Sequence, residues 1–101
     1  MSVSAHIRWL TPEEGGRTHP PVGPQYSTTA RFEAQTEEQW LADAWSLILE
    51  LQQPPDESGR QVVRARFLAK NGPSMWLQPS KTFVLYEGKR KVAEGIVVDE
   101  P

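Results

Sequence analysis

Few residues of this chain could carry out acid–base chemistry. The two histidines are His6 and His19, and either could be imagined in a Ser-His-Asp arrangement with Asp43 or Asp99. A general base needs a positioned partner, and no nucleophile-elbow motif or other framing sequence surrounds these residues. We therefore expect both histidines to be structural or solvent-exposed, and we predict that the protein is not an enzyme.

Two adjacent carboxylate pairs, Glu13-Glu14 and Glu37-Glu38, are the other candidates for acid–base chemistry. Neighbours in an extended chain point apart, so neither pair is expected to share a proton. A metal site needs three or four converging ligands, and none is visible in a chain without cysteine. No GxxxxGK[ST] segment is present to cradle phosphates. We predict no metal, no cofactor and no bound nucleotide.

Positive charge gathers in two places that could contact RNA phosphates. One cluster comprises Lys81 and the run Lys89, Arg90 and Lys91, and the second comprises Arg64, Arg66 and Lys70. Tyr86 or Trp76 could stack on a base beside them. The formal net charge of -2, from 11 Lys and Arg against 13 Asp and Glu, opposes a dedicated nucleic-acid binder. A solvated hairpin and a charged sheet edge would explain the same clusters.

Size and composition indicate one small soluble domain covering residues 1–101. The first ten residues carry His6 and Arg8 and are not followed by the apolar region of a signal peptide. The longest apolar run is about four residues, against about 20 for a membrane span. The absence of cysteine fits a reducing compartment. We expect a cytoplasmic protein without membrane contact.

Alternating hydrophobicity predicts six or seven short strands separated by turn residues. They are expected over residues 2–10, 26–35, 44–52, 60–70, 82–87 and 91–99, with a short strand or extended piece at 74–78. Gly88 predicts a hairpin turn, and Gly95 predicts a bulge or bend inside the last strand, where Val92, Ile96 and Val98 share one face. The pattern favours a closed antiparallel barrel or a sandwich, and a barrel leaves no exposed sheet edge.

Residues 36–53 admit two interpretations. Thr36 and Gln39 have the form of a capping box, and the apolar residues from Trp40 to Ile48 fit helical spacing. Alternation of Trp45, Leu47, Leu49 and Leu51 fits a strand instead. We expect a short helical turn or loop over 36–43 and a strand from about 44 to 52. Trp9 and Trp45 fall on inward faces, whereas Trp40 and Trp76 could serve packing or binding.

Three segments carry a resemblance to a known family: TPEEGGR at Thr11–Arg17, GPQYSTTARF at Gly23–Phe32 and KTFVLYEGKRKVAEGIVV at Lys81–Val98. Together they resemble the third domain of elongation factor Tu. The resemblance implies an all-β fold, a closed six-stranded antiparallel β-barrel of Greek-key type. The last segment departs from the usual glycine-pair form of the family at Lys89, Ala93 and Glu94.

The resemblance also implies two kinds of partner. In the family this barrel contacts the GTPase domain of its own chain, and the matching positions here are Gly15, Gln25 and Val84. It also contacts the T-arm of transfer RNA, and the matching positions here are Arg17, Gln25, Glu87 and Gly88. This chain carries no GTPase motif, so the first surface could face a separate protein, pair with itself or have lost its contact altogether.

The sequence therefore predicts a non-catalytic interaction module that binds a protein partner. The alternative is RNA binding through Arg17, Gln25, Glu87 and the Lys89–Lys91 cluster.

Overall fold

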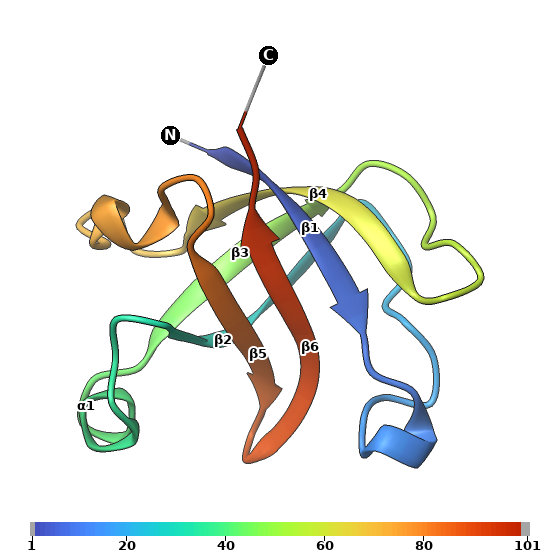
Figure 1. The fold of residues 1–101 in the computed structure, drawn as a ribbon, viewed down its shortest axis with the longest axis horizontal. Coiled ribbons are helices and arrows are strands. Elements are labelled where there is room, and N and C mark those ends of the chain that lie inside the picture. Colours follow the sequence, from blue (N-terminus) through green and yellow to red (C-terminus); the bar gives the residue numbers. More distant parts are fainter. Residues whose placement is uncertain (1, 100–101) are drawn as a thin grey trace.

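The computed structural model describes residues 2–99, which form a closed antiparallel β-barrel of six strands (Figure 1). The strands are β1 Val3–Trp9, β2 Gln25–Phe32, β3 Trp45–Leu51, β4 Arg60–Phe67, β5 Thr82–Glu87 and β6 Arg90–Val97. The helices are short: the 3-10 helices η1 Pro12–Glu14 and η2 Ser74–Leu77, and the α-helix α1 Glu37–Ala42. The predicted fold class is confirmed.

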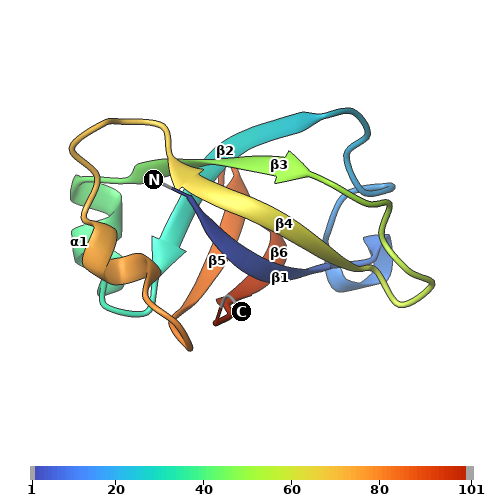
Figure 2. The same cartoon turned by 90° about the horizontal axis from the view of Figure 1, so that it is seen from above.

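The strands follow the order β1-β4-β3-β2-β5-β6 around the barrel. Strands β2, β3 and β4 form a consecutive meander. The long connection that contains η1 leads from β1 to β2, and β1 lies on the far side of the meander beside β4. This arrangement is a Greek key. Helices α1 and η2 lie at one end of the barrel and η1 lies at the other (Figure 2).

The barrel closes because β1 is paired along both of its edges. Its residues pair with β4 from Val3 opposite Ala65 to Arg8 opposite Arg60. They also pair with β6, where His6 lies opposite Ile96. The first and last strands are therefore paired, and no strand edge is left open in the described part of the chain, as expected for a barrel.

Side chains fill the barrel interior. The alternation predicted for β1 and β3 is confirmed, because Ala5, Ile7 and Trp9 are buried and so are Leu47 and Leu49. The other residues of the core cluster come from β2, β4, β5, β6 and η2: Ala30, Phe32, Val63, Ala65, Leu77, Phe83, Leu85, Val92, Ala93 and Val97. Trp45 packs against this core, as expected, and Trp76 does so as well.

The ambiguous segment contains both a helix and a strand. The Thr36 hydroxyl accepts the Gln39 amide N–H at 3.1 Å, and the Gln39 side chain accepts the Thr36 amide N–H at 2.9 Å. This capping box starts α1, which lasts six residues before β3 begins. The prediction of a short helical turn followed by a strand is confirmed, since an uninterrupted helix would remove Leu47 and Leu49 from the barrel interior.

Residues 74–77 form the 3-10 helix η2, so the predicted short strand there is wrong. The Trp76 amide donates to the carbonyl of Pro73 at 2.9 Å, which continues the preceding turn into a helical one. The Trp76 ring lies 5.4 Å from the Phe32 ring, and Leu77 is buried. The helical turn places both side chains over this end of the barrel interior. An extended segment of the same length would move them away from the core.

The predicted irregularity in β6 lies at Val92 and not at Gly95. Leu85 pairs with Ala93 and Tyr86 pairs with Lys91, so Val92 is an extra residue on β6. A bulge of this kind reverses the alternation beyond it. Val92 and Ala93 are consequently both buried, whereas Ile96 points outward, and the predicted shared face of Val92 and Ile96 is wrong.

Gly95 is needed for packing inside the barrel. It pairs regularly with Phe83 and with Ile7. A Cβ atom at this position would lie 2.4 Å from two carbons of the Phe83 ring and 2.8 Å from the Ile7 Cδ1 atom. The absence of a side chain therefore lets the Phe83 ring fill the space beneath β6.

Gly95→Ala should reduce the free energy of unfolding by about 1–3 kcal/mol, because the methyl group overpacks a core that has no room for it. Chemical denaturation monitored by tryptophan fluorescence measures the change. Ser27→Ala, at an exposed site of β2, is the matched strand control and should stay within about 0.5 kcal/mol of the wild type. Equal stability of the two variants would show that Phe83 has room to move.

Candidate functional site

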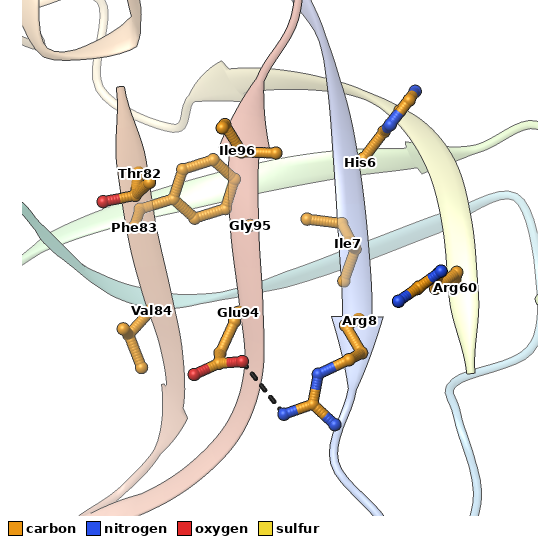
Figure 3. A pocket seen from close by; sticks show the side chains of 10 residues that line it. All are labelled: His6, Ile7, Arg8, Arg60, Thr82, Phe83, Val84, Glu94, Gly95 and Ile96. Carbon is orange, nitrogen blue, oxygen red and sulfur yellow. Dashed lines mark hydrogen bonds and ion pairs between the residues drawn. The ribbon is translucent and has the colours of Figure 1, made fainter. Parts of the chain in front are cut away.

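A groove of about 620 Å³ crosses the outer face of β1, β6 and β5 (Figure 3). We call it the outer groove. Its lining residues are His6, Ile7, Arg8, Arg60, Thr82, Phe83, Val84, Glu94, Gly95 and Ile96. It is the largest of the hollows described here on the surface formed by residues 2–99.

The strand register builds the outer groove. Ile7, Gly95 and Phe83 lie opposite one another on three strands, and because the Ile7 and Phe83 side chains point inward, backbone forms the floor. Outward side chains on either side of this line form two walls. The Arg8 row consists of Arg60, Arg8, Glu94 and Val84, and the Ile96 row consists of Val62, His6, Ile96 and Thr82.

The Arg8 row contains a network of ion pairs. The Arg8 guanidinium donates to Glu94 at 2.9 Å and to Glu14 at 3.1 Å, and the Lys91 ammonium donates to Glu94 at 2.9 Å. Lys91, followed by Arg8, holds the pKa of Glu94 below its ordinary value. Two positive and two negative groups thus balance within the network.

The Ile96 row is mostly uncharged. Ile96 and Val62 each expose 40% of their surface. His6 lies between them on the exposed face of β1, and Thr82 is exposed at the β5 end. The outer groove therefore has one charged wall and one mainly apolar wall.

A second cluster forms around Glu87 at the end of β5. The Arg17 guanidinium and the Tyr26 hydroxyl both donate to the same carboxylate oxygen of Glu87. The Arg17 guanidinium lies 5.5 Å from the centre of the Tyr26 ring, and its Nε donates to the carbonyl of His19 at 3.1 Å. The cluster fastens the loop after η1 to the barrel.

Burial and hydrogen bonding compete at this cluster. Partial burial alone would raise the pKa of Glu87, but the donors from Tyr26 and Arg17 outweigh it and the pKa lies below its ordinary value. Burial and the hydrogen bond to Glu87 raise the pKa of Tyr26 to about 12. At neutral pH Glu87 is therefore ionised and Tyr26 is protonated, as a stable hydrogen bond between them requires.

The residues predicted to contact RNA lie beside the Glu87 cluster or belong to it. Gly88 has φ of +62° and begins a two-residue hairpin loop between Glu87 and Arg90, as its position predicted. Lys89 and Arg90 are exposed and make no ion pair within residues 2–99, whereas Lys91 binds Glu94. Arg17 is occupied by Glu87.

The two predicted basic clusters change in the structure. Lys81 precedes β5 and so lies at the opposite end of that strand from the Lys89–Lys91 run, about 20 Å away by strand geometry. Arg64 donates to Ser2 and Ser4, and Arg66 lies 3.8 Å from Glu50. Neither cluster therefore forms a continuous stripe of unpaired charge.

The aromatic rings considered for base stacking are already packed. The Tyr86 ring lies 4.5 Å from the Trp40 ring, and the Trp76 ring packs against Phe32. The Trp40 indole nitrogen is buried and has no hydrogen-bond partner within residues 2–99. Each ring is half-exposed and has an aromatic neighbour on part of its surface, which leaves less room for a base to stack.

The three predicted protein-interface positions do not form one patch. Val84 belongs to the outer groove, and Gly15 is connected to it through Glu14, which binds Arg8 in the Arg8 row. Gln25 lies on β2 opposite Glu50 of β3 and does not line the groove. It precedes Tyr26 and so lies beside the Glu87 cluster.

The candidates for acid–base chemistry stay apart. His6 lines the outer groove, and the His19 ring lies 3.2 Å from the carbonyl of Pro20 in a loop. Within residues 2–99, no three metal-binding side chains converge. No helix in the same range has the length and apolar character needed to cross a bilayer.

A comparison with protein-family models and a comparison with curated proteins both find no match to this chain. The function must therefore be argued from the geometry of the outer groove and the Glu87 cluster. Sequence reasoning identified Val84 and Glu87 but missed the groove itself. Arg8 lies opposite Arg60 on one side and Glu94 on the other because of the strand register, which no local pattern specifies.

Glu87→Gln should lower the free energy of unfolding at pH 7 by about 1 kcal/mol, because it weakens hydrogen bonds from Arg17 and Tyr26 to a charged acceptor. The folded-state pKa of Glu87 lies below the unfolded value. Its stabilising contribution is therefore complete above the unfolded pKa and is lost as pH falls through the folded one.

Denaturant unfolding of the wild type and of Glu87→Gln from pH 7 to pH 3 measures this difference. The gap between the two proteins should narrow as the pH falls through that window. Glu57→Gln, at an exposed site of the loop before β4, makes the same charge change away from the Glu87 cluster and is the matched control. A difference in the free energy of unfolding that stays constant with pH would mean that the charge of Glu87 does not stabilise the Glu87 cluster.

Proposed function

We propose that this protein is a non-catalytic interaction module that binds another protein through the outer groove. The observation that carries the proposal is the pairing of a charged wall with an apolar wall across a groove of about 620 Å³. Protein interfaces combine buried apolar contacts with a polar rim in this way. Val84, which the sequence singled out as an interface position, lines the groove.

Exposed aliphatic surface supports the proposal. Ile96 and Val62 lie in the Ile96 row and could be covered by a partner without any rearrangement of the barrel. Burial of apolar surface stabilises a complex by roughly 25 cal/mol per Å² before the costs of association. The ion pairs of the Arg8 row hold the opposite wall in place, so the groove is preformed.

Kinship with the third domain of elongation factor Tu is part of this proposal. A closed six-stranded Greek-key barrel is the architecture that the sequence resemblance implies, and that agreement supports it. In that family the barrel serves as a binding domain, which fits a module of this kind. The proposal includes the cytoplasmic location expected from the sequence.

RNA binding is the alternative, and one observation favours it. Lys89 and Arg90 project from the hairpin next to the hollow formed by Arg17, Thr18, His19 and Glu87. Against it, Arg17 and Lys91 already form ion pairs with carboxylates, and the Tyr86 ring packs against Trp40. Two unpaired cations supply only a small electrostatic attraction to a phosphate backbone.

Protein binding through the outer groove is tested by affinity capture with mass spectrometry, followed by titration of the purified partner. Val84→Ser combined with Ile96→Ser removes apolar contacts from both walls, and it should weaken the complex about tenfold or more. The matched control is Val22→Ser with Met75→Ser, two exposed apolar residues outside the groove, which should leave the affinity unchanged. Equal affinities for both double variants would overturn the proposal.

A parallel titration with transfer RNA tests the alternative. If the alternative holds, affinity should fall steeply as salt is added, and Lys89→Glu with Arg90→Glu should abolish binding. Lys70→Glu with Lys81→Glu makes the same charge change elsewhere and is the control. No binding at low salt would exclude the RNA alternative.

A further inference from the structure

Two arginines lie directly opposite each other on the outer face of the barrel. Arg8 of β1 and Arg60 of β4 are cross-strand partners, and both side chains point away from the core (Figure 3). Like charges placed directly opposite on a sheet destabilise it. The pair therefore needs negative charge nearby, and the available carboxylates are distributed unequally between its two members.

Arg8 has its negative partners and Arg60 does not. Glu94 and Glu14 both bind the Arg8 guanidinium. Two acids, Asp56 and Glu57, precede Arg60 in the loop before β4, but neither forms an ion pair with its side chain within residues 2–99. The Asp56 carboxylate accepts the backbone N–H groups of Ser58 and Arg60 and the Ser58 hydroxyl. The Arg60 side chain has no direct carboxylate partner within residues 2–99 and feels only a longer-range attraction from Asp56. A positive charge without an ion pair therefore lies at the β4 end of the groove.

The wall across from this charge is apolar. Ile96 lies one strand away from His6, and Val62 lies beyond His6 on β4, next to Arg60 on the same outward face. An extended segment presents successive side chains to opposite sides. Placed in the groove, it could direct an acidic side chain to Arg60 and the adjacent aliphatic side chain to Ile96.

We propose that the outer groove binds an extended acidic segment of another protein, in which a carboxylate pairs with Arg60 and a neighbouring aliphatic residue packs on the Ile96 row. This inference rests on the proposed function and specifies the chemistry of the partner. Charge complementarity favours an acidic occupant over a basic or neutral one, since Arg60 is the one groove charge that the described residues leave without an ion pair.

Selection of displayed random peptides on the wild-type protein tests the inference. The selected peptides should be enriched in Asp or Glu next to Leu, Ile, Val or Phe. Fluorescence polarisation then measures the best peptide. Arg60→Gln should weaken its binding about tenfold, whereas Lys89→Gln, the same charge change at the hairpin tip, should leave it unchanged.

A double-mutant cycle locates the contact. Replacing the acidic residue of the peptide by its amide should weaken binding to the wild type, but should have little further effect on Arg60→Gln. Thermal unfolding checks that the variant is folded. Arg60→Gln should be about as stable as the wild type, because the lost repulsion from Arg8 and the lost attraction to Asp56 act in opposite directions.

The outcomes separate this inference from the proposal on which it rests. Peptides that require Val84 and Ile96 but carry no acidic residue would overturn the acidic partner and leave the groove as a protein-binding site. Peptides indifferent to Arg60, Val84 and Ile96, or no selected peptide at all, would overturn both. Concentration-dependent dimerisation that is lost in Arg60→Gln would make a second copy of the chain the occupant and overturn a separate partner.

Discussion

The hydrogen bonding of β1 along both edges is the constraint on which the rest of the structure depends. Its pairing with β4 and with β6 turns a five-strand sheet into a closed barrel. Two open edges would otherwise invite pairing with other chains. The same pairing aligns four strands so that the Arg8 row and the Ile96 row run across them, and the groove exists only because the barrel is closed.

Local patterns specify most of the fold. Period-two alternation in β1, β2 and β3 identified the inward residues, because a half-buried strand must place apolar side chains on one face. The capping box at Thr36 and Gln39 separated α1 from β3. The failures at η2 and at Val92 have a common cause, since a compact turn and a bulge are stabilised by distant packing partners that the local sequence does not reveal.

The candidate site was predictable only in part. Arg17 and Glu87 were singled out through resemblance, and the structure brings them together as partners of each other. The ion pair indicates a structural role for both residues, because the negative charge of Glu87 weakens the attraction between Arg17 and a phosphate. Arg8, Arg60 and Glu94 gave no sequence signal, as their facing is fixed by three separate strand registers.

The long sequence separation of the closing strand has a kinetic consequence. His6 pairs with Ile96 and Ala5 pairs with Val97, while the β2–β3–β4 meander joins near neighbours. Contacts between distant residues form slowly, because the intervening chain loses entropy before they become favourable. During synthesis the β2–β3–β4 meander can form early. The barrel cannot close until β6 has left the ribosome, and until then one edge of β1 has no hydrogen-bonded neighbour.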